Sequence, residues 1–322
     1  MRETASPGRT CPTAYHYGPA VFRRPPELEA ETLYAAGGLY GNLPALQALE
    51  ALAAQERAAL VFNGDFHWFD AEPGWFAQVQ AGVLRHHASR GNVETEIAAP
   101  ESLAGCGCAY PPEVDDGVVE RSNRIAQRLR EVARRTPDAA ATLAALARLP
   151  MHWRAQVGGH RVAVVHGDAH TLAGWQFDAA RLHAPGAEAA LHALFDQASV
   201  DVFASSHTCL PALRPVGQRG VVVNNGAAGM PNFAGTGFGL VTRLSLHAPA
   251  QGLPVLYGQR HELPAGALHV HALRVDFNTR AWEDRFLATW PEGSDAHRSY
   301  WPRIRQGPAF QLTDVTHPQG RP

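Results

Sequence analysis

Residues 33–46 read LYAAGGLYGNLPAL, and residues 58–65 read AALVFNGD. The first stretch opens on an apolar run, Leu33 to Ala36, which is followed by glycines and then by Asn42, a residue type that caps helices. Leucines then recur at every third position, which is the spacing of one helical face. The second stretch is another short apolar run that ends in a polar turn. This order of strand, turn, helix and strand is a βαβ unit and predicts a layered α/β fold.

The same design recurs further along the chain. Residues 153–165 have the pattern of a hairpin that turns at Gly158-Gly159, and the second strand ends at His166. Apolar runs at 200–204 and 221–223 also end in polar turns. Further elements are predicted, namely helices within 118–148, broken near Thr136-Pro137, and a strand at 268–277.

The composition sets limits on the class of protein. The chain has 322 residues, 45% of them hydrophobic and 18% charged, which is typical of a globular protein. The 28 basic and 30 acidic residues nearly cancel, so we expect no broad nucleic-acid footprint. We find no apolar run long enough for a membrane span and no signal-peptide pattern near the N-terminus. Four cysteines do not make a disulfide scaffold, and we expect a cytoplasmic protein.

Three segments are predicted from these patterns. Residues 1–30 are rich in Pro and Arg and are expected to form an N-terminal extension on the domain surface. Residues 31–247 contain the recurring strands and form the main domain. Residues 248–322 contain a predicted strand and then several aromatic residues, which we interpret as a strap packed on the core. The alternative for that strap is a lid that faces a substrate.

Five polar turns follow predicted strands. In α/β sheets, ligand sites gather at the carboxyl ends of strands, so the turns are expected to lie close together. Their Asp, Asn and His side chains suit a divalent transition metal such as Mn, Fe or Zn better than Ca or Mg. The residues concerned are Asn42, Asp65, Asn92, His166 and His207.

These turns resemble, in order, the motifs of the calcineurin-like metallophosphoesterase family. The resemblance spans about residues 31–247 and rests on five segments. It implies an α/β sandwich of two mixed β-sheets flanked by helices. It also implies a metal-dependent hydrolase acting on phosphoesters. The segments are Gly37 to Leu46, Gly64-Asp65, Gly91-Asn92-Val93-Glu94, Val165-His166-Gly167 and Ser206-His207-Thr208-Cys209, with Asn225-Gly226 as the glycine turn after the last histidine motif.

The departures from the family pattern fall on one of its two metals. The first motif reads Gly38-Leu39-Tyr40, so its metal-binding Asp and His are both replaced. The last histidine is replaced by Cys209, and the family's catalytic histidine is replaced by Val93. By the resemblance, the ligands of the other metal are all retained. We therefore expect a single divalent metal, held by Asp65, Asn92, His166 and His207.

Other side chains are weaker candidates. Cys106 and Cys108 form a C-x-C pair that, with Cys209, would suit a thiolate metal site, although buried inert cysteines are commoner. Tyr40 is predicted either to donate a hydrogen bond to a phosphate or to fill the space of the missing metal. Three residues near the turns are candidates for hydrogen bonding to the metal ligands or for contacting the substrate, namely His67, Asp168 and His170.

We therefore expect a phosphoesterase-like hydrolase with an altered, mononuclear metal site. Its substrate is expected to be a small phosphomonoester or phosphodiester, and the sequence assigns no catalytic residue. Two alternatives remain open at this point. One is an inactive protein of this fold that binds a phosphorylated ligand or a protein partner. The other is a thiolate-metal or redox protein using Cys106, Cys108 and Cys209.

Overall fold

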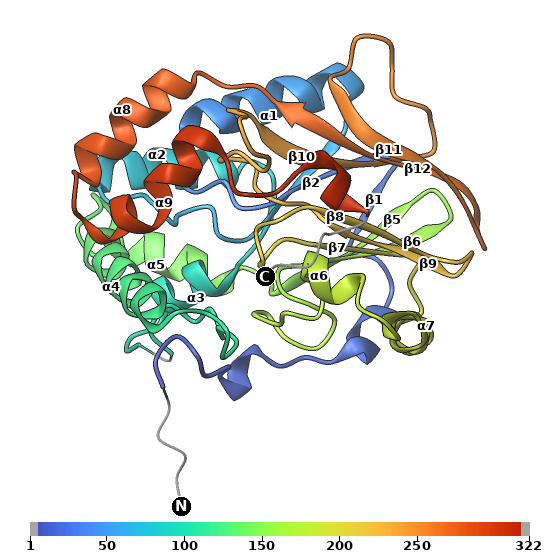
Figure 1. The fold of residues 1–322 in the computed structure, drawn as a ribbon, viewed down its shortest axis with the longest axis horizontal. Coiled ribbons are helices and arrows are strands. Elements are labelled where there is room, and N and C mark those ends of the chain that lie inside the picture. Colours follow the sequence, from blue (N-terminus) through green and yellow to red (C-terminus); the bar gives the residue numbers. More distant parts are fainter. Residues whose placement is uncertain (1–5, 103, 317–322) are drawn as a thin grey trace, which may run out of the picture.

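The computed structural model describes residues 6–102 and 104–316, and two six-stranded sheets stack face to face within them (Figure 1). The first five residues of the predicted N-terminal extension and the last six of the predicted strap lie outside the described residues. The strands of the first sheet, in spatial order, are β1 (Leu28–Ala30), β5 (His152–Val157), β6 (His160–Val165), β7 (Val202–Ser205), β9 (Gly220–Asn224) and β8 (Ala212–Val216). Those of the second sheet are β11 (Val255–Leu263), β12 (Gly266–Val275), β10 (Gly239–Ser245), β2 (Thr32–Ala36), β3 (Ala59–Asn63) and β4 (His87–Ser89).

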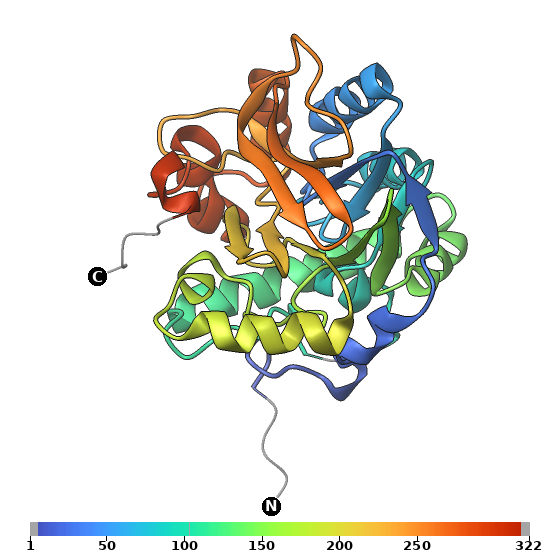
Figure 2. The ribbon, with the colours of Figure 1, turned by 90° about the vertical axis from the view of Figure 1, so that its right-hand side faces the viewer.

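Helices cover the outer faces of both sheets (Figures 1 and 2). The α-helices are α1 (Leu43–Glu56), α2 (Pro73–Val83), α3 (Asn92–Ala98), α4 (Asp116–Ala133), α5 (Ala139–Arg148), α6 (Ala179–Leu182), α7 (Ala187–Ala198), α8 (Thr279–Thr289) and α9 (Asp295–Gln306). Short 3-10 helices lie at Thr13–Tyr15, Pro19–Arg23 and Leu312–Val315. The predicted sandwich of two mixed sheets flanked by helices is thus confirmed.

The opening βαβ unit is present as the sequence predicts. Strands β2 and β3 pair in parallel, and α1 connects them. The side chain of Asn42 caps α1 by accepting a hydrogen bond from the backbone N–H of Ala45 at 3.0 Å. Strand β4 extends the parallel pairing, so the carboxyl ends of three strands lie at one edge of this sheet.

Alternation along β2 explains why two layers form. Leu33 and Ala35 pack into the apolar core between the sheets, together with residues of β6 and β7. Tyr34 and Ala36 point the other way, into the core between the second sheet and its helices. Successive side chains of a strand face opposite sides, and all four are buried, so β2 needs a covering layer on both faces.

Strands β6, β7 and β9 supply the matching edge of the first sheet. They pair in parallel, while β5 and β6 form the predicted hairpin around Gly158-Gly159. The predicted helical region at 118–148 is α4 and α5, separated near Thr136-Pro137. The parallel strands of both sheets end on the same side of the molecule, and this is where the polar turns meet.

The C-terminal segment completes the second sheet. Strand β12 covers most of the strand predicted at 268–277, and it pairs with β10 and with β11. The sequence did not predict β11, because its side chains are mostly exposed and show no clean alternation. The edge strand β8 was also missed, since it contains Pro215, a residue that is tolerated only at sheet edges.

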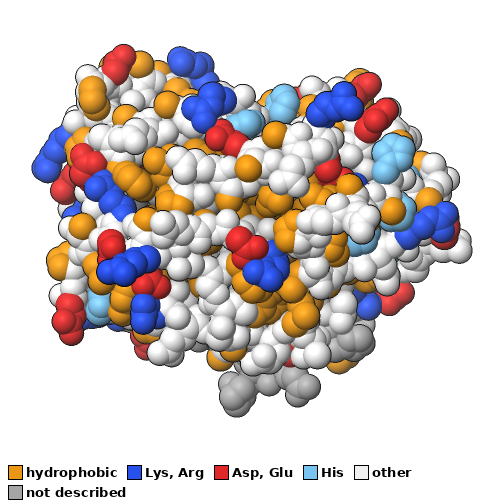
Figure 3. All heavy atoms as spheres, turned by 90° about the horizontal axis from the view of Figure 1, so that it is seen from above, with side chains coloured by type: hydrophobic (Ala, Val, Ile, Leu, Met, Phe, Trp, Pro, Cys, Tyr) orange, Lys and Arg blue, Asp and Glu red, His pale blue; other side chains and the backbone are white. Residues whose placement is uncertain are grey.

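The surface carries mixed charge, and no described helix is long and apolar enough to cross a membrane. On the face shown in Figure 3, acidic and basic side chains are interspersed rather than gathered by sign.

Candidate metal centre

Four polar side chains that follow strand ends converge where the two sheets meet. Asp65 follows β3, Asn92 begins α3, and His166 and His207 follow β6 and β7. Around Nε2 of His166 lie Oδ1 of Asn92 at 3.1 Å, Nδ1 of His207 at 3.2 Å and Oδ2 of Asp65 at 3.3 Å. Ligand atoms of Asp65, His166 and His207 all lie within 4.8 Å of one another. The structure thus brings together the four side chains named from the sequence.

Each of the two histidines donates a hydrogen bond from one ring nitrogen to a backbone carbonyl, and this directs its other ring nitrogen, as an acceptor, toward the cluster. Nδ1 of His166 donates to the carbonyl oxygen of Asn63 at 2.8 Å, and Nε2 of His207 donates to that of Cys108 at 2.9 Å. A neutral imidazole that donates from one nitrogen offers a lone pair on the other. The two lone pairs face each other across 3.2 Å, beside the carboxylate of Asp65.

Asn92 is oriented in the same manner. Its amide nitrogen donates to the carbonyl oxygen of Cys106 at 2.8 Å, which leaves Oδ1 directed at His166. The cluster therefore contains four acceptor atoms from Asp65, Asn92, His166 and His207. Acceptors at such distances repel one another unless a positive charge lies between them, either a metal ion or a proton on Nε2 of His166. One carboxylate, one amide oxygen and two imidazoles are a donor set that fits a divalent transition metal.

Burial and mutual charge set the protonation of the cluster. Burial opposes ionisation of Asp65, but His166 outweighs burial and holds the pKa of that carboxyl below its usual value. Burial likewise favours neutral His166, and Asp65 reverses this, so the pKa of His166 is raised. Burial and the neighbouring His166 lower the pKa of His207 to about 4. At neutral pH His207 is therefore uncharged, as a metal ligand must be.

A buried carboxylate that the sequence did not single out fixes the geometry of two of the turns. Glu94 is fully buried and accepts hydrogen bonds from the backbone N–H groups of Asp65 and Gly91, both at 2.8 Å. It also accepts one from His67 at 3.2 Å. Burial, and then the charge of Asp65, raise the pKa of Glu94. Glu94 thus joins the turn after β3 to the start of α3.

Replacing Glu94 with alanine is expected to lower the free energy of unfolding by about 3 kcal/mol, because it leaves buried N–H groups without acceptors. Thermal denaturation of the metal-free protein measures this effect. Glu101→Ala removes an exposed carboxylate close by in the chain and should leave the melting temperature within a degree or two of wild type. Equal melting temperatures for the two variants would show that Glu94 does not hold the turns.

Protein atoms fill the space beside Gly38, where the resemblance implies a second metal. A side chain at Gly38 would overlap the ring of Tyr40, which lies where a first-motif aspartate would project. The hydroxyl of Tyr40 contacts Sγ of Cys209 at 2.8 Å, so the replacements of two lost histidines contact each other. Of the two roles predicted for Tyr40, the geometry favours filling the space.

Tyr40 and Cys209 also share an unusual backbone conformation. Their φ angles are 56° and 62°, and that of Asp65 is 54°. Non-glycine residues rarely adopt positive φ, and a bulky side chain makes it costlier. The three tight turns therefore place their side chains at a cost in backbone strain, which is typical of functional sites.

The three cysteines proposed for a thiolate site are not gathered in one cluster. Cys106 and Cys108 are joined to each other as a disulfide, and both are buried. Sγ of Cys209 contacts Tyr40 and donates to the carbonyl oxygen of His207 at 3.2 Å. Among residues 6–102 and 104–316, the only group of three potential ligands that converges is the cluster of Asp65 and the two histidines. The loop of Cys106 and Cys108 acts through its carbonyls, which orient Asn92 and His207.

Cys209→Ser is accordingly expected to leave the metal content unchanged. Burial raises the pKa of the Cys209 thiol, although Arg303 opposes this shift, and a neutral thiol is a poor metal ligand. Elemental analysis of the purified variant beside wild type measures the result. A fall in bound metal would restore the thiolate interpretation.

His67, Asp168 and His170 do not line the cavity beside the cluster. His67 is buried, stacks on Phe76 with ring centroids 3.6 Å apart, and lies 2.5 Å from a carboxylate oxygen of Asp70. Asp168 accepts backbone N–H groups of its own loop, including that of His170 at 2.8 Å. His170 is exposed, and its carbonyl holds the N-terminal segment. These three residues support loops around the site.

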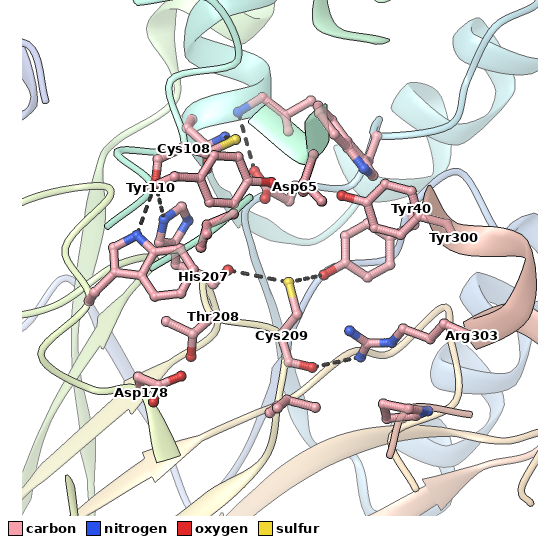
Figure 4. A pocket seen from close by; sticks show the side chains of 18 residues that line it. Tyr40, Asp65, Cys108, Tyr110, Asp178, His207, Thr208, Cys209, Tyr300 and Arg303 are labelled. Atoms are coloured by element: carbon pink, nitrogen blue, oxygen red, sulfur yellow. Dashed lines mark hydrogen bonds between the residues drawn. The ribbon is translucent and has the colours of Figure 1, made fainter. Parts of the chain in front are cut away.

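A cavity of about 350 Å³ opens beside the cluster (Figure 4). Asp65, Asn92 and His207 line part of it, and the remaining lining combines aromatic side chains with aliphatic and polar ones. Five lining residues were not assigned to the site from the sequence, and two of them, Tyr300 and Arg303, come from a segment distant in the chain from the four ligand side chains. The five are Trp68, Tyr110, Trp175, Tyr300 and Arg303.

Known proteins share this architecture although their sequences differ from that of this chain. No family model matches the chain, and no curated protein matches it by sequence. Its structure is similar to that of hypothetical protein PH1004 of Pyrococcus horikoshii OT3, with a TM-score of 0.55 and 15% identity over 86% of this chain and 99% of that one. It is also similar to a metallophosphoesterase of Sphaerobacter thermophilus, with a TM-score of 0.50 and 16% identity over 86% of this chain and all of that one.

Proposed function

For a chain with the calcineurin-like metallophosphoesterase fold, we propose a metal-dependent phosphoesterase-like hydrolase with a single metal ion. The observation that carries the proposal is the convergence of four acceptor atoms, from Asp65, Asn92, His166 and His207, beside an open cavity that the first two and His207 line. A divalent metal bound there supplies Lewis acidity toward a phosphoryl oxygen and lowers the pKa of water. Its identity is expected among Mn, Fe and Zn.

The residues around the cluster perform distinct tasks. Asp65 supplies the only carboxylate and balances part of the cation's charge. The carbonyls of Asn63 and Cys108 keep His166 and His207 in the tautomers that present a lone pair. Aromatic side chains in the lining reduce the polarity beside the cluster and thereby strengthen electrostatic interactions there.

The leaving group is constrained by a missing proton donor. Val93 occupies the position of the family's catalytic histidine, and a buried valine side chain carries no proton to transfer. We therefore propose that the substrates are small phosphomonoesters or phosphodiesters whose leaving group is stable as an anion. A phenolate with electron-withdrawing groups meets this requirement, and an unactivated alkoxide does not.

A two-part experiment tests this proposal. The purified chain is loaded separately with Mn²⁺, Fe²⁺ and Zn²⁺ and assayed with 4-nitrophenyl phosphate, bis-4-nitrophenyl phosphate and the corresponding unactivated alkyl esters. We expect metal-dependent turnover of the nitrophenyl esters and at least about 100-fold slower turnover of alkyl esters, the contribution typical of a general acid. Turnover that persists after chelation, or that is equal for both leaving groups, would contradict it.

A non-catalytic protein that binds a phosphorylated ligand is the second candidate. The side chain of Tyr40 in the space beside Gly38 and the valine at position 93 both favour it. Metal-dependent binding of a phosphorylated ligand, with no hydrolysis of any ester in the panel, would establish this alternative.

A further inference from the structure

We propose that Arg303 is the anion-binding residue of this cavity and that it donates to a non-bridging oxygen of the phosphoryl group. The inference rests on the proposed function and assigns a binding role to a side chain from the C-terminal helix α9. Arg303 lines the same cavity as Asp65, Asn92 and His207, and Figure 4 shows its guanidinium directed toward Cys209.

The backbone fixes one edge of the Arg303 guanidinium. Its Nη2 donates to the carbonyl oxygen of Cys209 at 2.7 Å, and its Nε donates to that of Pro231 at 3.3 Å. Both partners are neutral, and Nη1 forms no hydrogen bond with residues 6–102 or 104–316. A donor group therefore remains for a ligand, on a side chain whose position is already set.

The charge of Arg303 is not balanced by an ion pair. Some arginines that pack between elements contact carboxylates, as Arg243 does with Glu56 and Arg285 with Glu72. Others, such as Arg161, donate only to backbone carbonyls, but Arg161 does not line the cavity. None of the ion pairs found within the described ranges contains Arg303. A half-buried guanidinium without a counter-charge, in a cavity partly lined by aromatic side chains, is a site for an anionic ligand.

The position of Arg303 relative to the metal cluster suits a phosphoryl group. Cys209 is two residues after the ligand His207, and Arg303 binds the carbonyl of Cys209. The charge of Arg303 also opposes the rise in pKa that burial causes in the Cys209 thiol and the Tyr40 hydroxyl. It thus lies on the side of the cavity where protein atoms fill the other metal's place. The lining contains one more carboxylate besides Asp65, that of Asp178. Asp178 caps α6 and lies away from Arg303 in Figure 4.

Helix α9 presents Tyr300 and Arg303 on one face. The two residues are three positions apart, a spacing that puts side chains next to each other on a helix. Both line the cavity, whereas Arg298 of the same helix is exposed and makes no side-chain hydrogen bond or ion pair with the described residues. Arg298 is therefore the matched control for a change of charge on α9.

Calorimetric titration with inorganic phosphate, in phosphate-free buffer, tests the proposal on the Mn²⁺-loaded and the metal-free chain. Arg303→Gln retains a donor for the Cys209 carbonyl but removes the charge, and we expect phosphate affinity to fall about 10- to 100-fold. Arg303→Lys should lose less affinity than the glutamine variant, since it retains the charge. Arg298→Gln should bind phosphate as wild type does.

The outcomes separate this proposal from the proposed function. Metal content and melting temperature should be unchanged in Arg303→Gln, and a loss of either would assign Arg303 a structural role and overturn the proposal. Unchanged phosphate affinity in Arg303→Gln, or no phosphate binding to wild type at millimolar concentration, would overturn it as well. If wild type hydrolyses no ester but binds phosphate through Arg303, the proposed hydrolase fails and this inference holds.

Discussion

Replacing Asp65 with asparagine is expected to lower metal affinity by at least about 100-fold and to abolish metal-dependent turnover. Asp65 is the only carboxylate among the four ligand side chains, and losing a hydrogen-bonding partner behind a ligand already costs 10- to 100-fold. Asparagine retains an oxygen for the backbone N–H of Val93, which contacts Oδ1 of Asp65 at 3.2 Å, so the turn itself should persist. Competition with a metal-binding dye measures the affinity.

The control for that experiment is Asp284→Asn, which neutralises an exposed carboxylate on α8. It should bind metal as wild type does, and both variants should melt cooperatively. Wild-type affinity and activity in Asp65→Asn would mean that Asp65 serves only as a turn residue and that the metal centre is assigned wrongly.

Rebuilding the other metal position should raise metal uptake from one ion to two per chain. The variant combines Gly38→Asp, Tyr40→His and Cys209→His, which returns the oxygen and nitrogen donors that the resemblance associates with that metal. Gly38→Asp alone should instead destabilise the chain by about 1–3 kcal/mol, because its side chain would overlap the Tyr40 ring. Histidine tolerates the positive φ at position 40 better than tyrosine does.

The double variant Tyr40→His with Cys209→His is the matched control. It gains both imidazoles but lacks the new carboxylate, so we expect it to remain at one metal. Elemental analysis after dialysis against micromolar Mn²⁺ gives the counts, and thermal denaturation gives the stability of each variant. If Gly38→Asp alone melts like wild type, the Tyr40 ring does not occupy that space.

Much of the fold follows from local sequence because strand ends carry polar turns. Runs such as 33–36 and 58–62 are short, apolar and bounded by glycine, so both strand and boundary are visible without a structure. The four ligand side chains follow from the same rule, since the parallel strands that precede them, two in each sheet, end on the same side of the molecule. Strands β8 and β11 lack this signal, because they lie at sheet edges, where one side is not paired.

The walls of the site could not be predicted in this manner. Arg303 follows Asp65 by more than two hundred residues, and only the packing of α9 brings it to the cavity. Its helix is rich in charge and aromatics, a composition that we interpret as a packed strap, with a substrate-facing lid only as the alternative. The filling of the space beside Gly38 likewise depends on where the Tyr40 ring lies, and residue type alone left its two roles equal. Glu94 was visible in the motif, but its three backbone hydrogen bonds depend on the folded turns.

The number of metal ions per chain tests the central claim most directly. We expect one tightly held divalent ion per chain after loading and dialysis, with anomalous scattering from crystals placing it among Asp65, Asn92, His166 and His207. Two ions about 3–4 Å apart and bridged by Asp65, the arrangement of two-metal sites, would contradict the account, as would no bound ion at all.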